Sequence, residues 1–146
     1  MTGIGIRILI VAAIAVGGIV LRDRLSSGAG DLKVGDCFDT TQATEVNDVQ
    51  HHPCTEKHNA EVVLVTTHPS IKGAAYPSDA DVQTYGDNVC APAVATYVGP
   101  KAQLDRLNYG IFYPKAADWK DGDRGVICYA LNIDLSPMTS SLKAGG

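Results

Sequence analysis

The four cysteines of this 146-residue chain constrain its fold more than any other feature. Cys37, Cys54, Cys90 and Cys128 all follow a strongly apolar N-terminal segment. An even number of cysteines in a small domain is typical of disulfides formed in an oxidising compartment. Four cysteines allow three pairings, and sequence alone does not choose among them. The expected elements favour Cys37–Cys54 between neighbouring extended segments and Cys90–Cys128 between a helix and the last strand.

The N-terminal segment has the length and composition of a membrane-spanning helix. Residues 8–21 carry no charge, and extending the segment back to Thr2 gives twenty residues interrupted only by Arg7. About twenty apolar residues cross a bilayer core of ~30 Å, and a single arginine can snorkel to the interface. We expect residues 1–24 to form a single-pass anchor. A cleaved signal peptide is the alternative, although the charged residues 22–24 stand where cleavage needs small side chains.

The charges beside this segment do not set its orientation, because Arg7 lies on one side and Arg22 with Arg24 on the other. The cysteines do set it, since their pairing requires an oxidising compartment. We therefore expect a cell-membrane protein whose C-terminal domain is extracytoplasmic. Small residues that would let a second membrane helix approach closely stand at Ala13, Gly17 and Gly18.

Residues 31–146 are acidic, with nine basic against fifteen acidic side chains. Binding to a phosphate backbone needs several clustered lysines or arginines, and this part of the sequence has no such cluster. We therefore expect no nucleic-acid partner. The sequence contains no cofactor motif and identifies no small-molecule ligand, so we expect no cofactor.

The rest of the chain divides into a linker at 25–30, one domain at 31–135 and a flexible Ser/Gly-rich tail at 136–146. A turn or short helix is expected at 114–122. Alternating or β-branched apolar residues predict strands near 32–38, 46–49, 60–67, 107–113 and 125–133.

One helix is expected to begin after Ser78, whose hydroxyl can cap the first turn, and to end near Gly99-Pro100. Pro92 removes a backbone donor inside it, which predicts one kinked helix or two short ones. The elements together predict an α+β fold. It consists of a small antiparallel sheet with the kinked or split helix packed on it, two disulfides, and a preceding transmembrane helix.

Side chains that can bind a metal gather around Cys54. Imidazole, thiolate and carboxylate groups all bind zinc or copper. If Cys54 forms a disulfide it leaves this set, and no common face is evident for the others. A nucleophilic Cys54–His58 pair would also need a free thiol and donors for an oxyanion, so we expect no enzyme. The candidate metal ligands are His51, His52, His58 and Glu61.

The stretch from Trp119 to Arg124 is interpreted as a structural turn. Gly122 permits unusual backbone angles, and Asp123 can bond local amides. Arg124 can pair with a carboxylate such as Asp36 or Glu61. Trp119 is expected to pack in the core or at its rim, with an exposed partner-binding role as the alternative.

The ordered combination of these features resembles the septum-formation domain family. The resemblance runs from about Leu32 to Ile133, and it implies a membrane-anchored, extracytoplasmic actinobacterial domain connected with cell division. It brings no catalytic residue. The matching residues are Val34-Gly35-Asp36-Cys37-Phe38, Val49, Cys54, His58, Glu61-Val62, Cys90, Tyr97, Gly99, Pro114, Trp119, Gly122-Asp123-Arg124 and Cys128.

Three functions are compatible with this sequence. The leading hypothesis is a non-catalytic interaction module that binds a protein of the division machinery or serves as an accessory subunit of a membrane complex. The second is an extracytoplasmic metal-binding protein that uses His51, His52 and His58. The third is a thiol-dependent enzyme.

Overall fold

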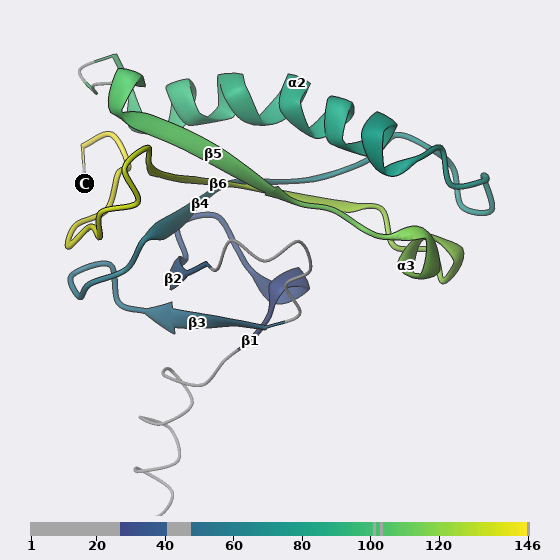
Figure 1. Ribbon diagram of the computed structural model, residues 1–146, viewed down its shortest axis with the longest axis horizontal. Coiled ribbons are helices and arrows are strands. Elements are labelled where there is room, and N and C mark those ends of the chain that lie inside the picture. The colour runs from purple at the N-terminus through teal and green to yellow at the C-terminus, as the bar shows by residue number, and fades with distance from the viewer. Residues whose placement is uncertain (1–26, 41–47, 101, 103, 146) are drawn as a thin grey trace, which may run out of the picture.

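The computed structural model describes residues 27–40, 48–100, 102 and 104–145 (Figure 1). The expected anchor at 1–24 lies outside these ranges, and so do Ala13, Gly17 and Gly18, the residues expected to pack helices in the membrane. Within the described ranges, no helix combines the length and apolarity that crossing a membrane requires.

The described residues form an α+β domain built on an antiparallel sheet, as the sequence predicts. Five strands carry the sheet, and a two-residue strand extends one edge, in the order β1-β3-β2-β4-β6-β5. One long helix, α2 (Asp79–Val98), accompanies the sheet. The strands are β1 (Ser27–Gly28), β2 (Cys37–Asp39), β3 (Asp48–His52), β4 (Ala60–Thr67), β5 (Leu107–Phe112) and β6 (Gly125–Asn132). The short helices are η1 (Ala29–Asp31), η2 (Leu104–Arg106) and α3 (Ala116–Lys120).

Strand β4 separates two apolar cores. Its neighbouring residues Val62 and Val63 lie in different cores, because successive side chains of a strand point to opposite faces. Val63 packs with the α2 side of the sheet, where the helix runs along β4, β6 and β5 (Figure 1). Val62 packs with Phe38 and Val49 from β2 and β3, on the other side. The sheet is therefore covered by apolar side chains on both faces of β4, with α2 packed on one of them.

The two disulfides pair as the arrangement of the elements favours. Cys37 on β2 is bonded to Cys54, just after β3, and Cys90 on α2 is bonded to Cys128 on β6. The loops they close are 17 and 38 residues long. In the chain-entropy model such loops contribute about 3 and about 4 kcal/mol of stability. Each is a large share of the ~5–15 kcal/mol that holds a small domain folded.

Helix α2 is one helix from Asp79 to Val98, so of the two alternatives that Pro92 leaves open the structure shows the single helix. Ser78 caps it by accepting a hydrogen bond from the Asp81 amide. Pro92 lies on its exposed side, where water can bond the carbonyl that proline leaves without a donor. The opposite side is held to β6 by the Cys90–Cys128 disulfide.

Both ends of the domain extend further than the sequence suggests. Ser27–Gly28 and Ala29 were expected in a linker, but β1 pairs with β3 and Ala29 is buried. The segment after residue 135 was expected to be a flexible tail. Instead, Met138 is buried and exchanges two backbone hydrogen bonds with His58. A few apolar side chains are enough to dock a segment whose composition is otherwise typical of a loose end.

Candidate functional site

The buried carboxylate of Glu61 is the centre of the most unusual polar cluster in the described part of the chain. Glu61 lies in β4 with none of its surface exposed, and its side chain is on the same face as that of Val63, toward α2. Its Oε1 accepts hydrogen bonds from the hydroxyls of Tyr97 and Ser141, both at 2.6 Å. Its Oε2 accepts one from the Leu142 amide at 2.6 Å. The carboxylate therefore ties together β4, α2 and the C-terminal segment.

Tyr97 serves this cluster as a donor. Burial and the hydrogen bond to Glu61 raise the pKa of Tyr97 above its ordinary value. The phenol therefore stays protonated at neutral pH and keeps donating to the carboxylate. No lysine or arginine among the described residues forms a salt bridge with Glu61, so three neutral donors stabilise it.

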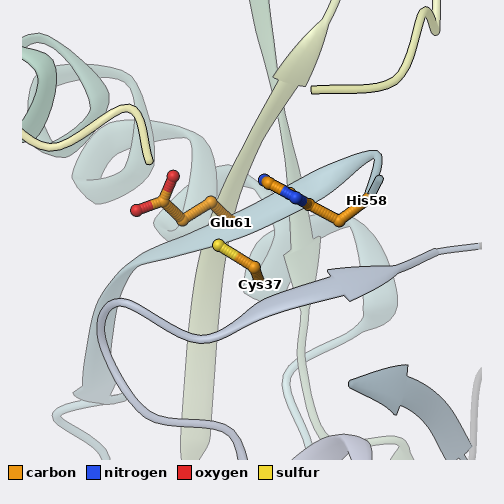
Figure 2. A group of neighbouring side chains, drawn as sticks. All are labelled: Cys37, His58 and Glu61. Atoms are coloured by element: carbon orange, nitrogen blue, oxygen red, sulfur yellow. The ribbon is translucent and has the colours of Figure 1, made fainter. Parts of the chain in front are cut away.

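His58 and Cys37 lie beside Glu61 and are also buried (Figure 2). The antiparallel pairing of β2 with β4 places Cys37 directly opposite Glu61, and His58 stands in the turn just before β4. One ligand atom from each of the three side chains lies within 4.8 Å of the other two. Figure 2 shows the three side chains close together, coming from three separate backbone positions, with the Glu61 carboxylate directed away from the His58 ring.

The His58 ring has one satisfied and one unsatisfied nitrogen. Its Nδ1 lies 2.8 Å from the Glu56 carbonyl oxygen, which can only accept, so Nδ1 carries the proton. Its Nε2 is buried and has no hydrogen-bond partner among the described residues. A buried polar atom without a partner is uncommon and calls for a specific explanation.

A metal ion does not fit this cluster while the disulfide is intact. The Cys37 sulfur is bonded to Cys54 and offers no thiolate. Both Glu61 oxygens already accept hydrogen bonds. This leaves the His58 Nε2 and one lone pair on the Glu61 Oε2, and two donors do not make a zinc site.

The structure divides the cluster of metal ligands that the sequence suggests. His58 and Glu61 come together, but no group of three candidate ligands in the described ranges includes His51 or His52. His52 instead lies 2.8 Å from the Asp39 carboxylate on the neighbouring strand β2. His51 and His52 are consecutive in β3, so their side chains point to opposite faces.

The turn around Trp119 is a structural cluster at the α3 end of the sheet. Trp119 is buried, and Arg124 stacks on its ring with the guanidinium carbon 3.6 Å from the ring centroid. Arg124 was expected to pair with a carboxylate, but its Nη atoms donate to the carbonyls of Trp119, Asp123 and Ile71. Two of these carbonyls belong to the turn itself, and the third comes from the loop after β4. Gly122 has a φ of 103°, which glycine adopts without strain.

The outer strand β5 offers a different kind of site. It is the last strand of the described sheet, and none of its residues Leu107–Phe112 is charged. The Tyr109 amide donates to the side chain of its own neighbour Asn108 at 2.9 Å, as expected for a group without a partner strand. Leu104 and Ile133, 44% and 62% exposed, flank one end of β5.

A pocket of about 480 Å³ lies where α2 ends, and the described residues that line it are Val98, Gly99, Pro100, Ala102 and 143–145. Among these described residues, Lys143 is the only one with a titratable side chain. The described lining therefore brings together no set of acid, base and nucleophile.

Sequence reasoning did not find the partners of Glu61. A carboxylate in the otherwise apolar run AEVVLV was a visible signal, because a buried charge requires donors. The donors themselves could not be identified from sequence. Tyr97 has the spacing of a residue on the apolar face of the helix, and Ser141 and Leu142 lie in the segment expected to be a flexible tail.

Comparison with known families identifies the family to which this domain belongs. The family model described as septum formation matches residues 34–142, which is well over half of the chain. The matched segment includes both disulfides, His58, Glu61, Tyr97 and the docked C-terminal segment. Searches of curated proteins and of solved structures give no match.

Proposed function

The chain belongs to the septum formation family, and we propose that its domain is a non-catalytic interaction module anchored outside the cytoplasmic membrane by residues 1–24. Two disulfides in a small domain suggest an extracytoplasmic compartment. The family description supports a role connected with cell division. We propose that the domain binds an extended segment of a protein of the division apparatus, or of a larger membrane complex in which it is an accessory subunit.

The uncharged free edge of β5 is the observation that carries this proposal. Natural proteins usually protect an edge strand with charged residues, proline or a bulge, because exposed backbone groups pair readily with another chain. Strand β5 has none of these within Leu107–Phe112. Its chemistry suits an extended polypeptide that adds a strand to the sheet, with Leu104 and Ile133 available to apolar side chains of the partner.

Catalysis is not part of the proposal because the reactive groups are already committed. All four cysteines are in disulfides, so no thiolate is available. Glu61 accepts hydrogen bonds at both of its oxygens. These observations favour a binding role over a thiol-dependent enzyme.

A matched pair of variants tests the edge. Asn108 is exposed on β5 and Gln83 is exposed on α2, so Asn108→Lys and Gln83→Lys add the same charge at two different surfaces. The full-length chain is captured from cell membranes in mild detergent, and co-purified proteins are quantified. We expect Asn108→Lys to reduce the recovered partner at least tenfold and Gln83→Lys to leave it unchanged. Equal recovery by both variants, or recovery of this chain alone as a dimer, would show that the proposal is wrong.

A further inference from the structure

Cys37, His58 and Glu61 form a group of three potential metal ligands. The disulfide between Cys37 and Cys54 keeps the Cys37 sulfur from binding a metal. We propose that opening this disulfide creates a zinc site formed by the Cys37 thiolate, the His58 Nε2 and the Glu61 carboxylate. The proposal is independent of the interaction function above. It differs from the sequence-based metal hypothesis, because His51 and His52 take no part and a cysteine does.

The geometry needs little rearrangement. Zinc lies about 2.3 Å from sulfur and about 2.0 Å from nitrogen or oxygen, so the donors of a tetrahedral site are roughly 3.3–3.8 Å apart. The three donor atoms here all lie within 4.8 Å of one another. Shifts of the order of 1 Å, within the range of side-chain rotation, would bring them into coordination distance. The fourth corner is free for Cys54 or water.

The orientation of His58 is the second observation that points to a ligand. Its Nε2 is buried and unpartnered, and the ring points toward Cys37 and Glu61 (Figure 2). Its Nδ1 donates to the Glu56 carbonyl, which leaves a lone pair on Nε2. Zinc-bound histidines are typically held in this way, with a carbonyl or carboxylate at the other nitrogen.

Glu61 can contribute without losing its present partners. A carboxylate oxygen has two lone pairs, and Oε2 accepts only the Leu142 amide. One lone pair of Oε2 is therefore left for a metal. The hydrogen bonds from Tyr97 and Ser141 to Oε1 would continue to orient the group.

The redox step balances with an external dithiol as the reductant. The dithiol attacks the sulfur of Cys54, the more exposed residue of the pair, and the Cys37 sulfur leaves as a thiolate. A mixed disulfide with Cys54 then resolves, so the dithiol is oxidised to a disulfide and Cys54 becomes a thiol. Zinc binds the Cys37 thiolate in place of a proton. Cys90 and Cys128 are completely buried, so their disulfide is shielded from the same reagent.

The variant Cys54→Ser tests the site without any reductant, because it leaves Cys37 as a free thiol beside His58 and Glu61. The full chain is titrated with Zn²⁺ against a chelating dye, and with Co²⁺ to detect a thiolate-to-metal absorption band. We expect one zinc per chain with Cys54→Ser, and no binding by the oxidised wild-type chain. Removing a ligand in Cys54→Ser/His58→Ala should weaken binding by at least about tenfold.

The matched control is Cys54→Ser/His52→Ala, which removes a nearby histidine outside the proposed site and should bind zinc as tightly as Cys54→Ser. The proposal is wrong if folded Cys54→Ser binds no zinc, or if the His58 and His52 variants weaken binding equally. If Cys54→Ser does not fold, the same zinc titration is carried out on the wild-type chain after a dithiol has reduced only the Cys37–Cys54 disulfide. Zinc binding by this sample would support the proposal, and its absence would overturn it. Loss of the fold in that sample as well would also overturn the proposal.

Discussion

Replacing Tyr97 by phenylalanine should weaken the domain more than the loss of one surface hydroxyl would. The hydroxyl donates at 2.6 Å to Glu61, whose side chain is fully buried, while the ring packs in the core beneath α2. Phenylalanine keeps the ring, so the loss is the hydrogen bond alone. A hydrogen bond to a charged group contributes about 1.5–3 kcal/mol. With a urea slope of about 1.5 kcal/mol per molar, the midpoint of unfolding should fall by more than about 1 M.

Tyr85→Phe is the matched control, since its hydroxyl donates at 3.1 Å to the neutral Thr67 carbonyl in an exposed setting. Its expected cost is below about 1 kcal/mol. Both variants are compared with the wild-type chain by urea unfolding followed by circular dichroism. If the two midpoints agree within error, the hydrogen bond from Tyr97 to Glu61 stabilises the domain no more than the exposed hydrogen bond of Tyr85 does. The Glu61 cluster would then not be a major source of stability.

Tyr97→Phe should also change how the stability of the domain depends on pH in the alkaline range. Because burial and Glu61 raise the pKa of Tyr97 in the folded state, the unfolded chain loses this proton first as the pH rises past about 10. The contribution of Tyr97 is therefore fully present below pH 10 and declines above it. Tyr97→Phe should lose stability less steeply between pH 9 and pH 11 than the wild-type chain.

Two further predictions concern the sheet and its α3 end. A Cβ at Gly110 would lie 2.1 Å from the Tyr129 ring, so Gly110→Ala should cost about 2 kcal/mol in thermal unfolding, and much less in a Tyr129→Leu background. Burial and Arg124 lower the pKa of His68, so the unfolded chain binds its proton more readily and stability should decline as the pH falls below about 6.5. His68→Gln should flatten this acid decline in urea midpoints measured from pH 7.5 to pH 5; an unchanged slope would contradict the assignment.

The elements that could be predicted from sequence are those whose own residues decide them. Strand β4 was predicted at its observed bounds, because a run of β-branched residues between polar turns has few other stable conformations. Helix α2 begins where the Ser78 cap predicts. The sequence leaves open whether the helix continues through Pro92, since that depends on which side of the helix meets solvent.

The contacts that could not be predicted are those made by backbone amides and carbonyls. Leu142 reaches Glu61 through its backbone amide, and Arg124 is held by backbone carbonyls. Because every residue has a backbone amide or carbonyl, the sequence does not indicate which of them a side chain will contact. The carboxylates of Asp36 and Glu61, expected as partners of Arg124 from their charge, are therefore not the groups that it binds. Docking of the C-terminal segment was missed for a related reason, because backbone pairing between Met138 and His58 holds it together with the buried Met138 side chain.

The disulfide shows how strand register decides chemistry that residue types leave open. From sequence, placing Cys54 in a disulfide removed it from the histidine cluster and weakened the case for a metal. The pairing of β2 with β4 changes that conclusion, because it sets Cys37 opposite Glu61 and beside His58. Shifting β2 by one residue would turn the Cys37 side chain to the other face of the sheet and separate it from both groups. The ligand set therefore depends on the register, and the disulfide decides whether its sulfur is available.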